Sequence, residues 1–321
     1  MNKKERVLAA LRSRPVDQIP VSFWQHFGKE QNQGKACVDA HEAFYRATDL
    51  DYIKVMHDGL VAPCSLDVKD ASDLWAYRPL GEKNPYIRDY VDRCAGVVDR
   101  IGGEVYVYCN IFPAMTLLRR IGDAKLHALI ERDRAAVLHA MDVMSEEIAL
   151  LSRLVIEKAG CLGIFAAFQG AESNRFACRE DFDEIVRPYD LRVLEAANEV
   201  SDYNMLHFCG WDEIPNHMEY YLDYPGCAVN WAIYVDQLSL EDGRKFFGGR
   251  PVMGGFDNRR GKLLYAAPRE AVEAETRRIV ESYKAATGST DGLIIGADCS
   301  FLTDFDIQRF TWVRETLASM K

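Results

Sequence analysis

The sequence predicts an α/β fold of the (β/α)8 TIM-barrel type, with residues 1–321 forming a single domain. Short apolar runs recur eight times, most of them are followed by a segment long enough for a helix, and no compositional break or Ser/Pro-rich linker divides the 321 residues. Strands that alternate with helices pair in parallel through right-handed crossovers. Eight such units in a chain of this length fit a closed barrel better than a doubly wound open sheet, which is the alternative.

The eight apolar runs are the predicted strands. Several of them, such as the run at residues 163–168, are apolar at nearly every position, which is typical of strands covered on both faces. In chain order, the predicted strands are 19–23, 51–56, 105–109, 161–168, 203–208, 227–232, 250–256 and 292–297. The longest connections lie between the second, third and fourth of these strands, and we expect lids or extra helices there.

The segments between the strands carry helical signals. Asp133 is a suitable cap for a helix whose apolar residues recur every three or four positions through 137–155, and Gly160 ends it. Asp181 begins a second predicted helix that runs to about residue 200. Pro268 suits the first position of a third helix, because proline is tolerated there.

Charge and cysteine content narrow the class of protein. The 39 Lys and Arg residues are outnumbered by 49 Asp and Glu residues, so an extended nucleic-acid groove is not expected. The longest apolar stretch, 159–168, is too short to cross a bilayer, and no signal peptide is visible. Nine cysteines without a CxxC pair indicate reduced thiols, and we expect a cytoplasmic protein.

The sharpest chemical feature is a candidate metal site. His207 and Cys209 stand two residues apart at the end of the fifth predicted strand, so their side chains share one face. Cys299 lies just past the eighth strand, and the strand ends of a barrel converge on one mouth. One imidazole and two thiolates suit zinc, with a fourth position left open for chemistry. The alternative is that these three residues belong to an ordinary core.

Five segments also carry motifs of a known family. They are 6–11 (RVLAAL), 15–21 (PVDQIPV), 182–189 (FDEIVRPY), 228–231 (AVNW) and 252–257 (VMGGFD). Over residues 3–320 the chain resembles the uroporphyrinogen decarboxylase superfamily, and particularly its branch of zinc-dependent methyltransferases that act with corrinoids. The resemblance implies a (β/α)8 barrel.

Within that branch, a His-x-Cys motif and a distant cysteine are the zinc ligands, and they map onto His207, Cys209 and Cys299. The decarboxylases instead carry a Gly-His-Gly motif near the last position, where this chain has Cys299. They also carry an arginine-rich segment after the first strand, whereas residues 23–27 here contain no arginine. A substrate with many carboxylates would lack its bidentate partners. The resemblance therefore favours methyl transfer over porphyrinogen decarboxylation.

Further site residues are predicted from their places at strand ends. Asp58 and Glu172 are the predicted catalytic residues. Asp58 resembles an aspartate that contacts the pyrrole nitrogens in the decarboxylases, and Glu172 is a candidate fourth ligand or proton donor; either is as readily a capping residue. We expect a substrate pocket whose aromatic walls suit an aromatic methyl donor, although packing in the top layer of the barrel also explains such residues. The predicted pocket residues are Phe23, Trp24, His26, Phe168, Gln169, Trp231 and Phe256.

The sequence therefore predicts a zinc-dependent methyltransferase. Its methyl group would pass between a small molecule (a methyl ether, methylated amine or thiol) and a corrinoid, meaning a cobalamin carried on a separate protein. Neither the direction of transfer nor the formation of a homodimer follows from the sequence. The alternatives are a decarboxylase of tetrapyrrole metabolism and a non-catalytic barrel that binds a tetrapyrrole or a partner.

Overall fold

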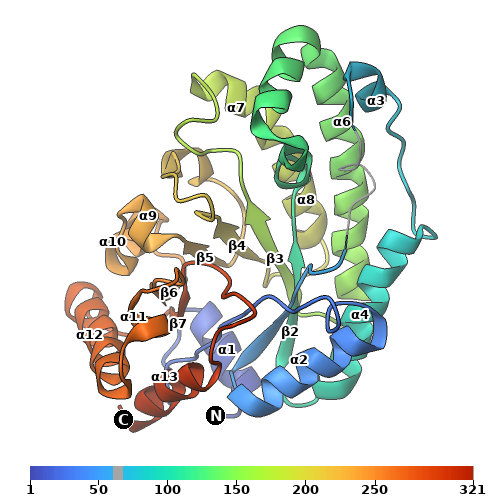
Figure 1. Cartoon of the computed structure of the whole chain (residues 1–321). Coiled ribbons are helices and arrows are strands. Elements are labelled where there is room, and N and C mark those ends of the chain that lie inside the picture. The colour runs from blue at the N-terminus through green and yellow to red at the C-terminus, as the bar shows by residue number, and fades with distance from the viewer. Residues whose placement is uncertain (61–67, 321) are drawn as a thin grey trace.

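The computed structural model describes residues 1–60 and 68–320. Seven parallel strands form one curled sheet in chain order, and helices lie outside it (Figure 1). Each strand pairs with the next in sequence, as expected for strands joined by short crossovers. The strands are β1 (Tyr52–Val55), β2 (Tyr106–Ile111), β3 (Gly163–Phe168), β4 (Met205–Phe208), β5 (Ala228–Trp231), β6 (Val252–Phe256) and β7 (Leu293–Ala297).

The helices connect these strands, except that only a 3-10 turn lies between β4 and β5. The α-helices are α1 (Lys3–Leu11), α2 (Gly34–Thr48), α3 (Ala71–Trp75), α4 (Pro85–Ile101), α5 (Ala114–Leu118), α6 (Asp123–Glu157), α7 (Arg179–Ile185), α8 (Arg187–Asn198), α9 (Ile233–Asp236), α10 (Leu240–Phe246), α11 (Leu263–Ala266), α12 (Arg269–Thr287) and α13 (Gln308–Ser319). Two 3-10 helices are η2 (Arg119–Ile121) and η3 (Met218–Tyr221). In the described part of the chain, no helix is long and apolar enough to cross a membrane.

Seven of the eight predicted strands are confirmed, and the first, 19–23, is not a regular strand. It lies between β7 and β1 and is joined to them by isolated hydrogen bonds, one of which runs from Ile295 N of β7 to Pro20 O at 2.9 Å. Ser22 N donates to Ile295 O of β7 at 3.0 Å, and Asp51 N donates to Val21 O at 3.0 Å. Pro20 lacks an amide hydrogen, so a continuous ladder cannot pass through it. The sheet is thus strongly curled, but the first predicted strand is reduced to isolated bridges.

Two predicted helices differ from the observed ones. The helix expected from Asp133 begins ten residues earlier, at Asp123, and Asp133 marks a kink (φ −152°, ψ 72°). Its carboxylate accepts a hydrogen bond from Ala136 N at 3.1 Å, so it caps the second part of the helix. The helix expected over 181–200 is divided into α7 and α8 just before Pro188, which has no amide hydrogen to continue α7.

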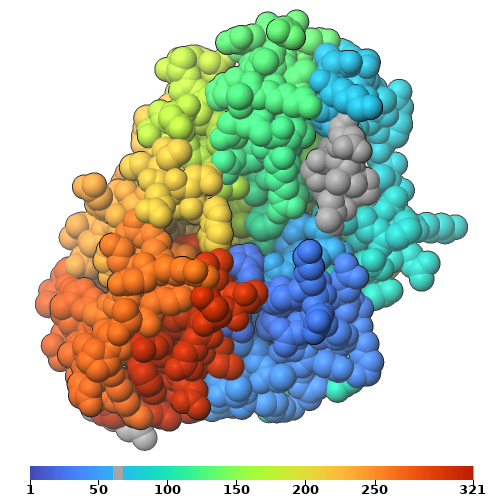
Figure 2. All heavy atoms as spheres, viewed as in Figure 1, coloured from blue at the N-terminus to red at the C-terminus, as the bar shows by residue number. Residues whose placement is uncertain are grey.

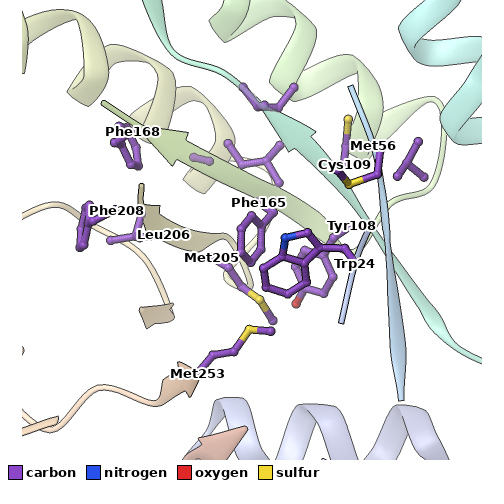
Figure 3. Packing of buried hydrophobic residues seen from close by; sticks show 14 of the residues in the cluster. Trp24, Met56, Tyr108, Cys109, Phe165, Phe168, Met205, Leu206, Phe208 and Met253 are labelled. Carbon is purple, nitrogen blue, oxygen red and sulfur yellow. The ribbon is translucent and has the colours of Figure 1, made fainter. Parts of the chain in front are cut away.

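The register of the central strands fixes which side chains face the interior of the curled sheet. Ala167, His207 and Asn230 stand side by side on β3, β4 and β5, and the next row is Phe168, Phe208 and Trp231. Because successive residues of a strand point to opposite faces, the two rows face opposite sides. Figure 3 shows Phe168 together with Phe208, well away from the interior pair Trp24 and Phe165.

Candidate metal centre and cavity

Three potential metal ligands meet at the carboxyl ends of the strands. His207 is on β4, Cys209 follows it, and Cys299 follows β7; all three are buried. The Sγ atoms of Cys209 and Cys299 are 3.8 Å apart, and Cys299 Sγ is 3.6 Å from His207 Nε2. In the described residues this is the single cluster of its kind, with all three ligand atoms within 4.8 Å of one another.

The spacing matches what a tetrahedral zinc ion requires. Zn–S bonds of about 2.3 Å and a Zn–N bond of about 2.0–2.1 Å place two sulfurs about 3.8 Å apart and sulfur and nitrogen about 3.6 Å apart. The two separations between Cys299 and its neighbours have these values. The donor set of one imidazole and two thiols therefore fits zinc in geometry as well as in chemistry.

Asn230 determines how the imidazole of His207 is oriented. Its Nδ2 donates to Met253 O at 2.9 Å and to Ala297 O at 3.0 Å, so both amide hydrogens are used. Its Oδ1, which is 2.5 Å from His207 Nδ1, must therefore accept a hydrogen bond from that nitrogen. The proton then resides on Nδ1, and the lone pair of Nε2 faces Cys299. This is the tautomer that a metal at Nε2 requires.

The two thiols are electrostatically unequal. The hydrogen bond from Cys209 lowers the pKa of Cys299 well below its usual value despite burial, with help from His207 and Lys54. The same hydrogen bond, together with burial, raises the pKa of Cys209. Cys299 is thus the more acidic of the two thiols, and the thiolate is the form that binds metals. Gly210, after β4, lets the chain pass close to Ala232, after β5, because a Cβ at residue 210 would overlap the Ala232 side chain.

The three ligands lie in the wall of a cavity of about 340 Å³. Three further predicted site residues, His26, Asp58 and Gln169, also line it. In Figure 2 the blue, green, yellow and red segments, from which the lining residues come, converge near the centre of the face shown. The other lining residues are Lys54, Met56, His57, Asn110, Phe112, Thr116, Arg119, Arg120, Ala167, Trp211 and Ser300.

Two predicted pocket residues, Phe168 and Trp231, lie on the outer face of the sheet. Phe168 contacts Phe208 with ring centroids 5.9 Å apart, and Trp231 packs against Phe247 at 5.6 Å. Both belong to the row that alternates with the inward-facing row containing His207. The structure therefore places them behind the strands, and we correct the expectation that they form the pocket.

Three other predicted pocket residues, Phe23, Trp24 and Phe256, do not line the cavity. Phe23 stacks on Phe310 with ring centroids 4.4 Å apart and meets Phe256 edge-on at 6.0 Å. Trp24 packs against Phe165 at 4.9 Å, as Figure 3 shows. All three predicted residues are buried in the aromatic packing below or beside the cavity. These three residues therefore serve packing, which was the alternative explanation for the aromatic residues in the sequence analysis.

Asp58 is held at the mouth by polar partners. Its Oδ1 is 2.7 Å from His26 Nδ1, and its Oδ2 accepts from Phe27 N at 2.8 Å. Burial alone would raise the pKa of Asp58, but these hydrogen bonds and the charge of His26 outweigh burial and lower it. Asp58 is therefore an ionised carboxylate that positions His26 at the edge of the cavity, where His26 also contacts Trp211.

Glu172, the other predicted catalytic carboxylate, does not line the cavity. Its Oε2 accepts from Gly170 N at 2.9 Å and from Arg175 Nε at 3.1 Å. Arg119 lies 3.6 Å from its other oxygen. Glu172 is thus the buried centre of an ion-pair network that holds the segment after β3, which is a structural role.

Sequence reasoning missed several polar residues of the site. Lys54 is buried on β1, and burial lowers its pKa to about 7, although electrostatic interactions with Cys299 and Cys209 raise it. Arg119 and Arg120 come from η2, after β2. The cavity therefore has cations beside the aromatic walls expected from the sequence. The sequence does contain a sign of this site: Lys54 alternates with Tyr52 and Met56, so its side chain points to the same face of the strand as theirs.

Comparison with known protein families identifies the family of this chain. A family model described as Uroporphyrinogen decarboxylase (URO-D) matches residues 53–320. The chain belongs to this family. The match covers all seven strands apart from the first residue of β1, and it includes the three candidate ligands. No curated protein matches the sequence significantly.

Solved structures show that the fold of this family member is shared more widely. A methyltransferase from Methanosarcina mazei superimposes with a TM-score of 0.81, covering 99% of each chain, at 14% sequence identity. Old Yellow Enzyme from Pichia sp. AKU4542 superimposes with a TM-score of 0.50, covering 90% of this chain and 85% of that chain, at 13% identity. At such identities these likenesses establish the fold alone.

Proposed function

We propose that this member of the uroporphyrinogen decarboxylase family is a zinc-dependent methyltransferase. It would move a methyl group between a small molecule and a corrinoid carried by a partner protein. The observation that carries the proposal is the buried set of His207, Cys209 and Cys299 in the wall of a cavity. A structural zinc site is closed by four protein ligands, whereas three ligands facing a cavity leave one position for a substrate.

The protein residues have distinct roles in this proposal. When bound, zinc would supply Lewis-acid chemistry, lowering the pKa of a thiol or polarising a substrate oxygen. Asn230 holds His207 in the tautomer that leaves Nε2 free. Asp58 and His26 form a polar pair at the mouth, and Gln169 offers an amide to the bound molecule.

The size of the cavity supports a small molecule as its occupant. About 340 Å³ is at the lower end of the range for small-molecule pockets, so a corrinoid would remain at the mouth. There, Trp211 is 45% exposed and its ring lies 5.6 Å from that of His26. Large exposed aromatic side chains are common at sites of partner binding. We further propose that residues 19–23 complete a closed (β/α)8 barrel below this mouth.

A single-turnover methyl-transfer assay tests the proposal. Zinc-loaded protein is mixed either with methylcobalamin and a thiol or with cob(I)alamin and a methoxyarene, and the cobalt spectrum is followed. We expect transfer by the native protein and only the uncatalysed rate in His207→Ala. Equal rates for the two proteins would contradict the proposal. Uroporphyrinogen turnover, measured in parallel, would instead support the decarboxylase alternative.

A further inference from the structure

Lys54 is a buried basic residue with no carboxylate partner in the part of the chain that the structure describes. Its side chain is 5% exposed, and Nζ donates to Asn110 Oδ1 at 3.2 Å. Nζ also lies 4.3 Å from the ring centroid of Trp24 and 4.5 Å from that of Phe165. Within residues 1–60 and 68–320, no carboxylate oxygen lies within 4.0 Å of it, the limit for an ion pair. The ammonium group thus stands in the wall of the cavity without a fixed counter-charge from an acid.

Such a group has unused binding capacity. An ammonium has three N–H donors, and Asn110 accepts one of them. The aromatic faces of Trp24 and Phe165 stabilise the charge but do not neutralise it. Burial of a charge is costly unless the charge is paired. Lys54 is therefore suited to pair with something that enters the cavity.

Two other lining groups also lack partners among the described residues. His57 is 6% exposed, and its Nε2 has no hydrogen-bond partner. Arg120 makes no ion pair and lies over the ring of Phe112 at 5.0 Å. These two groups add one polar nitrogen and one cation to a cavity that already contains Lys54. Arg120 is exposed and can be solvated by water, whereas buried Lys54 would be satisfied by an acceptor-rich molecule, as would buried His57 with its hydrogen on Nε2.

The acidic groups of the cavity do not balance these cations. Asp58 is the single carboxylate among the described lining residues, and it is already bound by His26 and Phe27. Arg119 is neutralised separately by Asp123 and Asp212. A divalent metal at the proposed site would neutralise the two thiolates. With that negative charge removed, the amine of Lys54 has no acid beside it among the described residues, so an oxyanion that binds next to it would hold its proton in place, and Arg120 adds a cation at the cavity wall.

We propose that Lys54 determines the charge class of the substrate, so that the cavity takes a small molecule bearing a carboxylate or a comparable oxyanion. The oxyanion accepts hydrogen bonds from the free N–H groups of Lys54, while the rest of the molecule lies against Met56 and Phe112 near the metal ligands. The inference rests on the proposed function, because it assigns the thiolate charge to the metal. Lys54 is a specificity-determining residue in this account, and it deepens that function by naming the substrate class.

Binding of two probes that differ in charge tests this inference. Isothermal titration calorimetry compares 3-methoxybenzoate with 3-methoxybenzamide on zinc-loaded native protein, and zinc is quantified in each sample. We expect the carboxylate to bind at least about tenfold more tightly, because hydrogen bonds to charged groups are the stronger ones. Lys54→Met keeps the length of the side chain between the two aromatic rings and should reduce the ratio to about one. Lys245→Met, at exposed Lys245 on α10, is the matched control and should leave the ratio unchanged.

The outcomes separate this inference from the proposed function. Equal affinities, or no binding of either probe, in native protein that holds zinc would overturn the role of Lys54 and leave the metal site intact. A ratio that persists in Lys54→Met would also overturn it. Native protein without zinc that still prefers the carboxylate, and loses that preference in Lys54→Met, would support the charge selection and count against the metal. The native ratio decides the matter even if Lys54→Met fails to fold.

Discussion

Substitution of Asn230 by alanine is the most informative perturbation of the metal centre. Asn230 makes three buried hydrogen bonds, to His207, Met253 and Ala297, and only the first concerns the metal. In Asn230→Ala the imidazole loses the acceptor that keeps its proton on Nδ1. His207 can then rotate or change tautomer, and Nε2 is no longer held towards Cys299.

The magnitudes follow from these contacts. Loss of a partner that orients a ligating histidine weakens metal binding by about 10- to 100-fold, or about 1.4–2.7 kcal/mol. Each of the three hydrogen bonds contributes about 1 kcal/mol net, so the free energy of unfolding of Asn230→Ala should fall by about 3 kcal/mol. Zinc affinity is measured by competition with a chromophoric chelator, and stability by denaturant unfolding.

Asn204 provides a matched control within the same strand region. It is also fully buried and has three hydrogen bonds, with Ile164 N at 2.9 Å and with Asn198 Oδ1 and Ser201 O at 2.8 Å. Asn204→Ala should lose similar stability but keep native zinc affinity, because it lies at the opposite end of β4 from the metal ligands. Native zinc affinity in folded Asn230→Ala, or an equal loss in the Asn204 variant, would refute the orientation argument.

Three further changes have defined outcomes. Cys299→Ala should lose zinc but stay folded, since the metal is not part of the core; full zinc occupancy by mass spectrometry would exclude Cys299 as a ligand. Glu172→Gln should lower the free energy of unfolding by about 3 kcal/mol, because it breaks a buried ion pair with Arg175. The rate of methyl transfer per folded molecule should stay unchanged. A 100-fold slower transfer would instead show that Glu172 is catalytic. Burial lowers the pKa of His41 from 6.5 to about 4, so the unfolded state binds a proton first as pH falls and stability is lost between those values. At about 1.36 kcal/mol per pKa unit this loss is about 3 kcal/mol, and His41→Gln should show a correspondingly flatter stability curve in urea titrations across that range; an unchanged curve would contradict the assignment.

The positions of the strands were predictable because each is a short apolar run separated by helical segments. Seven runs became strands within a few residues of their predicted limits. The run 19–23 did not, because Pro20 breaks the ladder and the neighbouring contacts depend on β7, far away in sequence. The division of the helix expected over 181–200 was missed as well, because helical signals continue on both sides of Pro188.

The metal ligands could be brought together from the sequence because only two rules were needed. Strand parity puts His207 and Cys209 on one face, and the shared edge of parallel strands brings in Cys299. The same parity rule, applied to Phe168 and Trp231, would have excluded them from the pocket. It was not decisive at the sequence level because the exact ends of the strands were unknown.

The cations of the cavity were harder to predict. Lys54 lies in the middle of an apolar strand, where one charged residue usually indicates an exposed edge rather than a buried site. Arg120 follows β2 in a short 3-10 helix whose direction depends on the packing of α5 and α6. The local sequence around Arg120 does not determine the direction of this 3-10 helix. That Lys54 has no ion-pair partner among the described residues becomes visible only when its surroundings are assembled in three dimensions.

The central claim is that His207, Cys209 and Cys299 hold a zinc ion. The most direct measurement is the metal content, by mass spectrometry, of protein purified without added metal. The account predicts about one zinc per chain in the native protein and none in Cys209→Ala. Native protein without zinc, even after reconstitution, would contradict the claim and leave these three residues as ordinary neighbours at the ends of strands.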